Sequence, residues 1–184
     1  MTSITDSVHH TLACHPQTLS QAIQGIDVVV GRAAGGNLTL AFALEGDLSA
    51  LRIPEPRPSR RGHGLWRHTC CEVFVMAGVG PGYREFNFSP SGEWVVYAFR
   101  GYREGGELEL ELNPGIVVQR NANRLRLYAE IGADVLPPGR SLRLALSAVV
   151  EDADGTLSYW ALRHLPGKPD FHHTDAFALQ LVQP

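Results

Sequence analysis

The sequence lacks a long apolar run, an excess of basic residues and the basic-then-apolar start of a secretory signal. No segment approaches the roughly 20 consecutive apolar residues of a membrane helix, so we expect no membrane contact. The formal net charge is -3, and the arginines are interleaved with acidic residues. This balance gives no broad attraction to nucleic acid, which we do not expect as a partner. Because residues 1–16 do not have the pattern of a signal peptide, we expect a cytoplasmic protein.

Cysteine is also scarce, with Cys14, Cys70 and Cys71 as the three examples. Cys14 has no partner at a recognisable spacing, so the sequence predicts no disulfide framework. Cys70 and Cys71 are adjacent in an expected strand, where successive side chains point to opposite faces. They therefore cannot share one metal ion, and we expect them to pack as small buried thiols.

The motifs of several enzyme classes are missing. The segment GRAAGG at residues 31–36 precedes an expected strand and lacks the Lys-Ser/Thr ending of a phosphate-binding loop. Neither a Gly-x-Ser-x-Gly nor a His-Glu-x-x-His motif occurs. We therefore expect a protein without catalytic activity of its own and without a required cofactor.

Long helical periods are absent, whereas short strand-like runs separated by turn signals recur from Leu65 onward. The Asp-Gly pair at residues 154–155 is a strong hairpin signal. Pro137 and Pro138 limit any helix there to a single turn. The pattern predicts an all-β fold, an antiparallel β-sandwich with at most short helical turns, in one domain over residues 1–184.

Two of the expected strands, 83–89 and 93–100, form a hairpin with mixed polar and aromatic residues. Their alternation places Tyr83, Glu85 and Asn87 on one face. A tight turn at residues 89–92 would pair Asn87 with Trp94. Trp94 and Val96 would then join this face. The opposite face, expected in the core, would hold the following residues: Phe86, Phe88, Val95, Tyr97 and Phe99.

An indole, an amide and a carboxylate side by side suit a sugar. A pyranose has an apolar face that stacks on an indole and hydroxyl groups that need paired donors and acceptors. Trp94, Asn87 and Glu85 are therefore one expected contact set. The alternative is that Trp94 is a core residue, with Glu85 and Asn87 facing solvent or bracing a loop.

Glu72 is an acidic residue in an otherwise apolar expected strand. A buried carboxylate needs a partner, which Arg84, Arg100 or Arg163 could supply. Glu72 and Glu85 together could instead form the carboxylate pair of a glycoside hydrolase. A hydrolase is therefore one alternative function.

The second dense constellation lies at residues 158–177 and adds loop residues at the edge of the sandwich. The histidines and aspartates resemble metal ligands in type, but no His pair has the i, i+4 spacing of a helical site, so we expect no metal. Hydrogen-bonded loop histidines are the first interpretation, followed by a ligand-contacting loop. The expected second contact set is Trp66, Arg163, His164, Lys168, Asp170 and His172.

Three segments carry a family resemblance: LWRHTCCEVFV at 65–75, YREFNFSPSGEWVVYAFRGYR at 83–103 and YWALRHLPGKPDFHHTDAFALQL at 159–181. They resemble the DOMON-like β-sandwich proteins, which are related to family 9 carbohydrate-binding modules, over roughly residues 38–181. The resemblance implies a jelly-roll-like sandwich that binds sugars or, in one branch, haem b. Sugar-binding relatives use paired tryptophans, for which the candidates are Trp66, Trp94 and Trp160.

The same resemblance implies two alternatives for a cofactor. Haem-binding relatives use a Met and a His as axial ligands, for which Met76 with His164, His172 or His173 are the candidates. Related sandwiches also hold calcium structurally. We expect a small-ligand binding module, most readily for a sugar, with a haem b electron carrier as the other alternative. Pairing of exposed edge strands makes a homodimer possible.

Overall fold

Strands make up nearly all of the regular structure in the computed structural model, which describes residues 4–33, 35–78, 80–139 and 141–182. The helical elements in these ranges are 3-10 turns of three residues each: η1 (Leu48–Ala50), η2 (Leu65–Arg67), η3 (Ala133–Val135) and η4 (Thr174–Ala176). The prediction of an all-β chain with at most short helical turns is confirmed. Within the described ranges, none of the helical turns has the length and apolar character of a membrane span.

The strands follow one another through short turns and a few longer loops. Their bounds are β1 (Ile4–Cys14), β2 (Ile23–Ala33), β3 (Leu38–Gly46), β4 (Arg60–Arg61), β5 (Cys70–Ala77), β6 (Tyr83–Phe88), β7 (Glu93–Gly101), β8 (Glu104–Glu107), β9 (Val117–Arg120), β10 (Arg124–Ile131), β11 (Ser141–Glu151), β12 (Leu157–Ala161) and β13 (Leu179–Val182).

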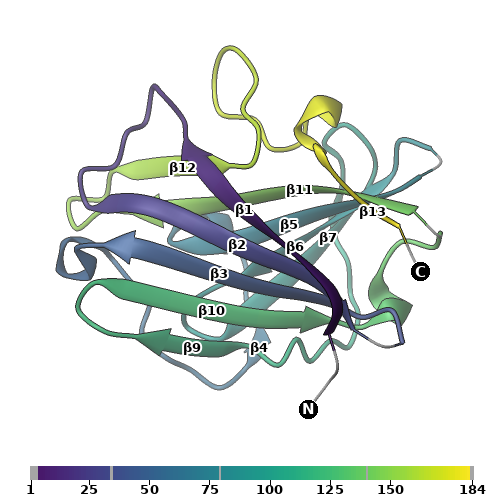
Figure 1. The fold of residues 1–184 in the computed structure, drawn as a ribbon, viewed down its shortest axis with the longest axis horizontal. Coiled ribbons are helices and arrows are strands. Elements are labelled where there is room, and N and C mark those ends of the chain that lie inside the picture. The colour runs from purple at the N-terminus through teal and green to yellow at the C-terminus, as the bar shows by residue number, and fades with distance from the viewer. Residues whose placement is uncertain (1–3, 34, 79, 140, 183–184) are drawn as a thin grey trace.

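The strands form one curled sheet in the order β4-β7-β6-β5-β11-β12-β1-β2-β3-β10-β9, with β13 beside β11 and β8 beside β7. β1 pairs with β2 along most of its length and with β12 through Ala13 and Cys14. It thereby joins a front half (β1, β2, β3, β10, β9) to a back half (β4 to β8, β11, β12 and β13). Figure 1 shows β2, β3 and β10 lying in front of β5, β6 and β7.

The hydrophobic core lies between the two halves. Alternate residues of the front strands, such as Val28 and Phe42, belong to the same buried cluster as Val73, Phe86 and Phe88 of the back half. Phe42, Phe86 and Phe88 are at most 1% exposed. Burial of each such side chain contributes about 1.5–3 kcal/mol, so the curl of the sheet is held by its own inner face.

The predicted register of the β6–β7 hairpin is wrong by one residue. Phe88 pairs with Trp94, and Asn87 pairs with Val95. The turn closes through the Ser89 N–H, which donates to the Glu93 carbonyl at 2.9 Å, and Gly92 adopts a φ of 92°. This is a three-residue loop with glycine at a left-handed position, which moves every later side chain to the opposite face.

The register has two consequences for the predicted faces. Trp94 and Val96 lie in the core with Phe86 and Phe88, so the expectation that they share a face with Glu85 is wrong. Val95, Tyr97 and Phe99, which were expected in the core, lie instead on the outer face with Tyr83, Glu85 and Asn87, because their partners across the strands are residues of that face.

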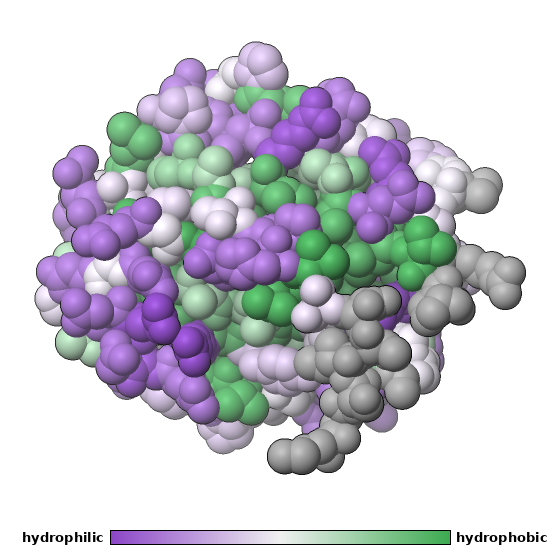
Figure 2. Space-filling model, in the orientation of Figure 1, coloured by the Kyte–Doolittle hydropathy of each residue, from purple (hydrophilic) through white to green (hydrophobic). Residues whose placement is uncertain are grey.

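The outer faces of the two halves differ. Figure 2 shows the front half, where hydrophobic side chains are interspersed with polar ones, and Val8, Val29 and Val117 are exposed there. The outer face of the back half carries a second buried cluster that includes Phe74, Tyr83 and Phe177. The C-terminal segment therefore covers part of this face, and the uncovered part is where the candidate site lies.

Candidate functional site

A hollow of about 600 Å³ lies on the outer face of the back half. Its floor is formed by the side chains of Glu72, Phe74, Glu85, Tyr97, Phe99, Val149 and Tyr159. Its walls come from Trp66 on η2, from Arg103, Gly105 and Gly106 at β8, and from Lys168, Pro169, Phe171 and His172 in the loop after β12. Five strands and three peripheral segments thus contribute to one site.

Strand alternation places two acidic residues together on this floor. Glu72 on β5 pairs with Asn87 on β6, and Phe74 pairs with Glu85. Glu72 and Glu85 are therefore diagonal neighbours on the same face, where long side chains can interact. Their side chains are 2% and 5% exposed. The sheet thereby buries two carboxyl groups side by side at the base of the hollow.

Each carboxyl group accepts a hydrogen bond from a neutral neighbour. Ser147 Oγ on β11 donates to Glu72 Oε2 at 3.0 Å, and Asn87 Nδ2 donates to Glu85 Oε1 at 2.9 Å. Asn87 is fully buried and does not line the hollow. Its role in this geometry is to brace Glu85.

Burial dominates the acid–base behaviour of both carboxyl groups. It raises the pKa of Glu72 well above its usual value, and the charge of Glu85 adds to the effect. Burial also raises the pKa of Glu85 to about 7, partly opposed by the Asn87 hydrogen bond and the Arg103 charge. At neutral pH, Glu85 is partly ionised, and Glu72 keeps its proton to a higher pH than an exposed glutamic acid does.

His172 faces Glu85 from the loop that follows β12. Its Nε2 atom lies 3.8 Å from Glu85 Oε2, and its Nδ1 atom is 2.8 Å from Tyr83 Oη. The Arg103 backbone N–H donates to the same hydroxyl at 3.1 Å, so the hydroxyl proton is left to donate to Nδ1. This arrangement assigns the ring proton to Nε2, pointing toward Glu85.

The imidazole of His172 is neutral near pH 7. Burial lowers its pKa to about 4, with the nearby Arg103 charge as the second cause and the Asp170 carboxylate in opposition. Tyr83 keeps its proton because burial raises its pKa. The His172 ring therefore offers a neutral N–H donor and brings no positive charge to the carboxyl pair.

Asp170 ties the loop to β8. It accepts hydrogen bonds from Tyr102 Oη at 2.7 Å, from Arg103 Nη2 at 3.0 Å and from the His172 N–H at 3.0 Å. Burial alone would raise its pKa, but these bonds and the Arg103 charge lower it. Asp170 thus holds Arg103 and His172 in place, outside the lining of the hollow.

Six aromatic rings surround the carboxyl pair: Trp66, Phe74, Tyr97, Phe99, Tyr159 and Phe171. Trp66 is 46% exposed, and the Arg67 guanidinium lies 5.2 Å from its ring centroid. Phe99 stacks on Tyr83 at a centroid distance of 4.8 Å. The hollow therefore combines flat apolar surfaces with buried polar groups, the usual composition of a small-molecule site.

The structure brings five of the predicted site residues together at the hollow: Trp66, Glu72, Glu85, Lys168 and His172. Asn87 and Asp170 lie immediately behind it, where they hydrogen-bond to Glu85 and Arg103.

The other four predicted residues lie elsewhere. Trp94 and Trp160 are core residues, and the Trp160 Nε1–H donates to Ser158 Oγ at 3.0 Å. His164 Nε2 lies 2.8 Å from the Ala13 carbonyl oxygen, and Arg163 is exposed outside the lining. The paired tryptophans that the resemblance implied are therefore not gathered at one surface.

The expected arginine partner of Glu72 is also not found. Arg84 donates to the Val135 carbonyl, and Arg100 pairs with Glu104 at 3.2 Å. Arg163 makes no ion pair among the described residues.

Several lining residues were missed from the sequence. Tyr97 and Phe99 were placed in the core because the hairpin register was wrong. Phe74 is two residues after Glu72, and the same two-residue alternation could have placed it on this face. Arg103 and Phe171 reach the site through the path of their loops, for which no local pattern gives a signal.

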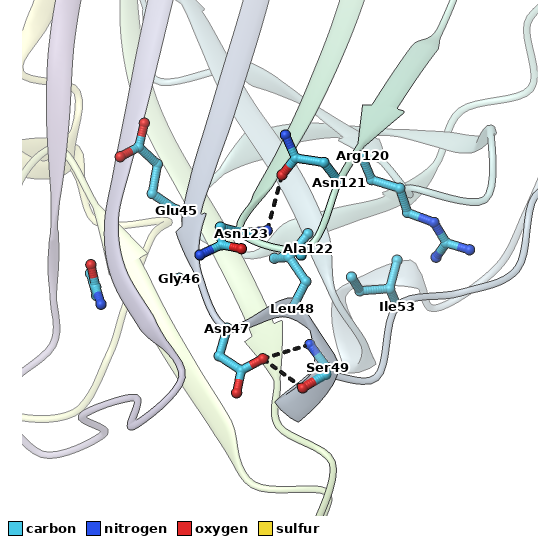
Figure 3. A pocket seen from close by; sticks show the side chains of 11 residues that line it. Glu45, Gly46, Asp47, Leu48, Ser49, Ile53, Arg120, Asn121, Ala122 and Asn123 are labelled. Atoms are coloured by element: carbon cyan, nitrogen blue, oxygen red, sulfur yellow. Dashed lines mark hydrogen bonds between the residues drawn. The ribbon is translucent and has the colours of Figure 1, made fainter.

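A second hollow, of about 800 Å³, lies where the β3–η1 turn meets the loop between β9 and β10 (Figure 3). Its polar groups serve the local turns. Asp47 Oδ1 accepts from the Ser49 N–H at 3.0 Å, and Asn121 Oδ1 accepts from the Asn123 N–H at 3.0 Å. Glu45 pairs with Arg124. Although larger, this hollow lacks aromatic lining and buried titratable groups, so the hollow above β5 and β6 is the stronger candidate.

The residues considered for a haem or a calcium ion can be located in the structure. Met76 is packed against Phe74, Tyr83 and Phe177, and His172 faces Tyr83 and Glu85. In the part of the chain that the structure describes, no three His, Cys, Asp or Glu side chains form a group suited to a metal ion.

Comparisons with known proteins show a likeness of fold to a solved structure. No family model matches the sequence, and no curated protein matches it. The crystal structure of a candidate carbohydrate-binding protein from Bacteroides uniformis superposes with a TM-score of 0.70 and 13% sequence identity. The match covers 97% of this chain and 86% of that chain. At this identity the likeness concerns the fold.

Proposed function

We propose that this chain binds a carbohydrate in the hollow above β5, β6 and β7. The observation that carries the proposal is the combination of aromatic rings, including the half-exposed Trp66, with the buried Glu72 and Glu85 and the partly buried His172. Sugar rings stack their apolar faces on aromatic side chains and satisfy their hydroxyl groups with carboxyl and imidazole partners. A hollow of about 600 Å³ is large enough for a short saccharide.

The fold neighbour gives independent support for this choice. That protein carries a carbohydrate-binding description, and its fold covers nearly the whole of this chain. The DOMON-like relationship and a jelly-roll order of strands belong to the same proposal. They are supported by the curled sheet, antiparallel except for the short β4–β7 pair, with one core between its halves.

The test is titration calorimetry with a panel of neutral and charged mono- and disaccharides. Trp66→Ala should weaken binding of any sugar that the unchanged protein binds by about tenfold, because stacking on one ring contributes on the order of 1 kcal/mol. Tyr128→Ala is the matched control, since Tyr128 lies on the outer face of the front half. Absence of binding to every sugar, or equal affinity in Trp66→Ala, contradicts the proposal.

A second candidate, glycoside hydrolysis, is favoured by the two neighbouring carboxyl groups and by the raised pKa of Glu85. Glycoside hydrolases use one carboxyl group as a proton donor and a second as nucleophile or base. Release of nitrophenol from aryl glycosides, abolished in Glu72→Gln and in Glu85→Gln, would support it. No turnover by the unchanged protein would leave binding as the function.

A further inference from the structure

The carboxyl pair on the floor of the hollow forms no ion pair with a Lys or Arg side chain of the described residues. Among the described residues, no Lys or Arg nitrogen lies within 4.0 Å of Glu72 or Glu85, and the nearest titratable nitrogen is His172 Nε2 at 3.8 Å from Glu85. His172 is neutral near pH 7. Buried carboxylates are disfavoured unless paired, so burial favours the protonated forms of this pair, and Glu85 is partly ionised at neutral pH.

The cations nearest to the hollow are engaged or exposed. Arg103 forms an ion pair with Asp170 at 3.0 Å, and its charge also acts on Glu85 without a direct ion pair between them. Lys168 is exposed in the loop that forms one wall. The two carboxyl groups of the floor therefore have no direct Lys or Arg ion pair among the described residues, and a cationic ligand can supply one.

The rings around the pair favour the same kind of ligand. Tyr97 and Phe99 on β7 and Phe74 on β5 belong to the floor that contains Glu72 and Glu85. Aromatic faces attract cations through the ring quadrupole, most strongly where water is excluded. Carboxyl groups bordered by rings, with no protein cation between them, have the composition of a site for an ammonium group.

We propose that the ligand of this hollow is an amino sugar whose protonated amine lies beside Glu85 and Glu72. The sugar part of this inference rests on the proposed carbohydrate binding. The amine part rests on the unpartnered carboxyl groups and the aromatic rings around them.

The test compares three disaccharides with the same ring and linkage that differ at carbon 2: β-1,4-linked glucosamine disaccharide, its N,N′-diacetyl form and cellobiose. Calorimetry at pH 7 should give an affinity for the free amine at least tenfold higher than for either neutral disaccharide. Cyclohexylamine and cyclohexanol form a second pair without a sugar, and the amine should bind more tightly than the alcohol.

Glu85→Gln should remove the selectivity for the amine while the neutral disaccharides bind as before. The matched control is Glu109→Gln, because the Glu109 side chain is 87% exposed. Circular dichroism verifies the fold of each variant, and Glu72→Gln replaces Glu85→Gln if the latter does not fold.

The outcomes separate the two parts of the proposal. Equal affinity for the three disaccharides overturns the amine inference and leaves carbohydrate binding in place. Binding of cyclohexylamine without any disaccharide supports the amine and overturns the sugar. No binding of any of these compounds overturns both, and unchanged selectivity in Glu85→Gln removes the carboxyl pair as its cause.

Discussion

The carboxyl group of Glu85 lies 3.8 Å from the Nε2 atom of His172, which a loop carries to it across 87 positions of the sequence. The Glu85 carboxyl group and the His172 imidazole do not form a full ion pair. Burial raises the pKa of Glu85 to about 7 and lowers the pKa of His172 to about 4, so each tends toward its neutral form. The molecule therefore maintains a buried, weakly charged floor in the hollow.

The raised pKa of Glu85 predicts that Glu85→Gln is more stabilising at high pH than at low pH. In the folded state, Glu85 keeps its proton up to about pH 7, whereas the unfolded chain loses it near the ordinary value of about 4.5. The side chain thus favours the folded state at low pH, and this contribution is lost as pH rises from about 4.5 through 7.

We compare the free energy of unfolding of Glu85→Gln with that of the unchanged protein at each pH. This difference should shift in favour of the variant by roughly 2 kcal/mol between pH 5 and pH 8. Urea denaturation at the two pH values measures it. Glu109→Gln should show no such pH dependence. A constant difference for Glu85→Gln would mean that Glu85 is ionised in the folded protein at pH 5.

Substitution of Trp94 and of Trp66 should have opposite effects on stability and on binding. Trp94 is 6% exposed and packs in the core, so Trp94→Ala should lower the free energy of unfolding by about 3–5 kcal/mol. Trp66 is 46% exposed at the mouth of the hollow, and Trp66→Ala should change stability by less than about 1 kcal/mol. Thermal and urea denaturation compare the two variants.

A stable Trp94→Ala protein with lost sugar binding would contradict the hairpin register described here. A strongly destabilised Trp66→Ala protein would show that this indole supports the fold rather than the ligand.

The wrong prediction for Trp94 shows which features of the hairpin can be predicted from the sequence alone. Strand alternation correctly grouped Tyr83, Glu85 and Asn87, because the two-residue period within a strand is a local property. The pairing with β7 depends on whether the loop holds two or three residues. Gly92 was the available clue, since a three-residue hairpin places glycine at its left-handed position, as its φ of 92° confirms.

The composition of the site was harder to predict than the strand faces, because it depends on contacts between distant segments. Glu72 and His172 were recognised by residue type. Nothing in the sequence indicated, however, that His172 and not His164 would be the histidine that lies near β6. That choice is made by the Tyr83 hydroxyl, the Asp170 contacts and the packing of Phe171 and Phe177 against the second cluster. These contacts join segments far apart in the chain and have no local pattern.

The hydrogen bond from the Tyr83 hydroxyl to His172 Nδ1 leads us to predict the tautomer of the His172 ring, with its proton on Nε2. Tyr83→Phe keeps the ring that stacks on Phe99 and removes the donor to Nδ1. The variant should fold with a loss of about 1 kcal/mol in stability, because one partly buried hydrogen bond is removed.

The measurement is the pair of ¹⁵N chemical shifts of His172. In the unchanged protein they should report the proton on Nε2, and in Tyr83→Phe they should move toward a mixture of the two tautomers. Tyr128→Phe is the control, since its hydroxyl is remote from this loop. Identical shifts in Tyr83→Phe and the unchanged protein would contradict the assigned donor direction.

The amine inference predicts that affinity rises with pH between 6 and 8. The ionised form of Glu85 is the one that attracts a cation, and with a pKa of about 7 its ionised fraction increases about tenfold over this interval. Cyclohexylamine is a suitable probe because an alkylamine, with a pKa near the value of about 10.4 for lysine, stays protonated throughout.

Of the other titratable groups around Glu85, His172 stays neutral throughout this interval, and the pKa of Glu72 is shifted in the same direction as that of Glu85. Burial raises the pKa of Cys70, Glu72, Tyr83 and Tyr97, and it lowers that of His172 to about 4. Arg103, whose pKa is raised by Tyr102 and Asp170 against the effect of burial, stays charged.

Calorimetry at pH 6, 7 and 8 should therefore show an affinity for cyclohexylamine that rises about tenfold in the unchanged protein and stays constant in Glu85→Gln. Cyclohexanol gives the background, because its weaker binding involves no charge and should not follow the ionisation of Glu85. An amine affinity that falls as pH rises would mean that the site binds its ligand with the carboxyl group protonated, and a hydrogen bond from Glu85 to a neutral ligand would then replace the ion pair as the basis of recognition.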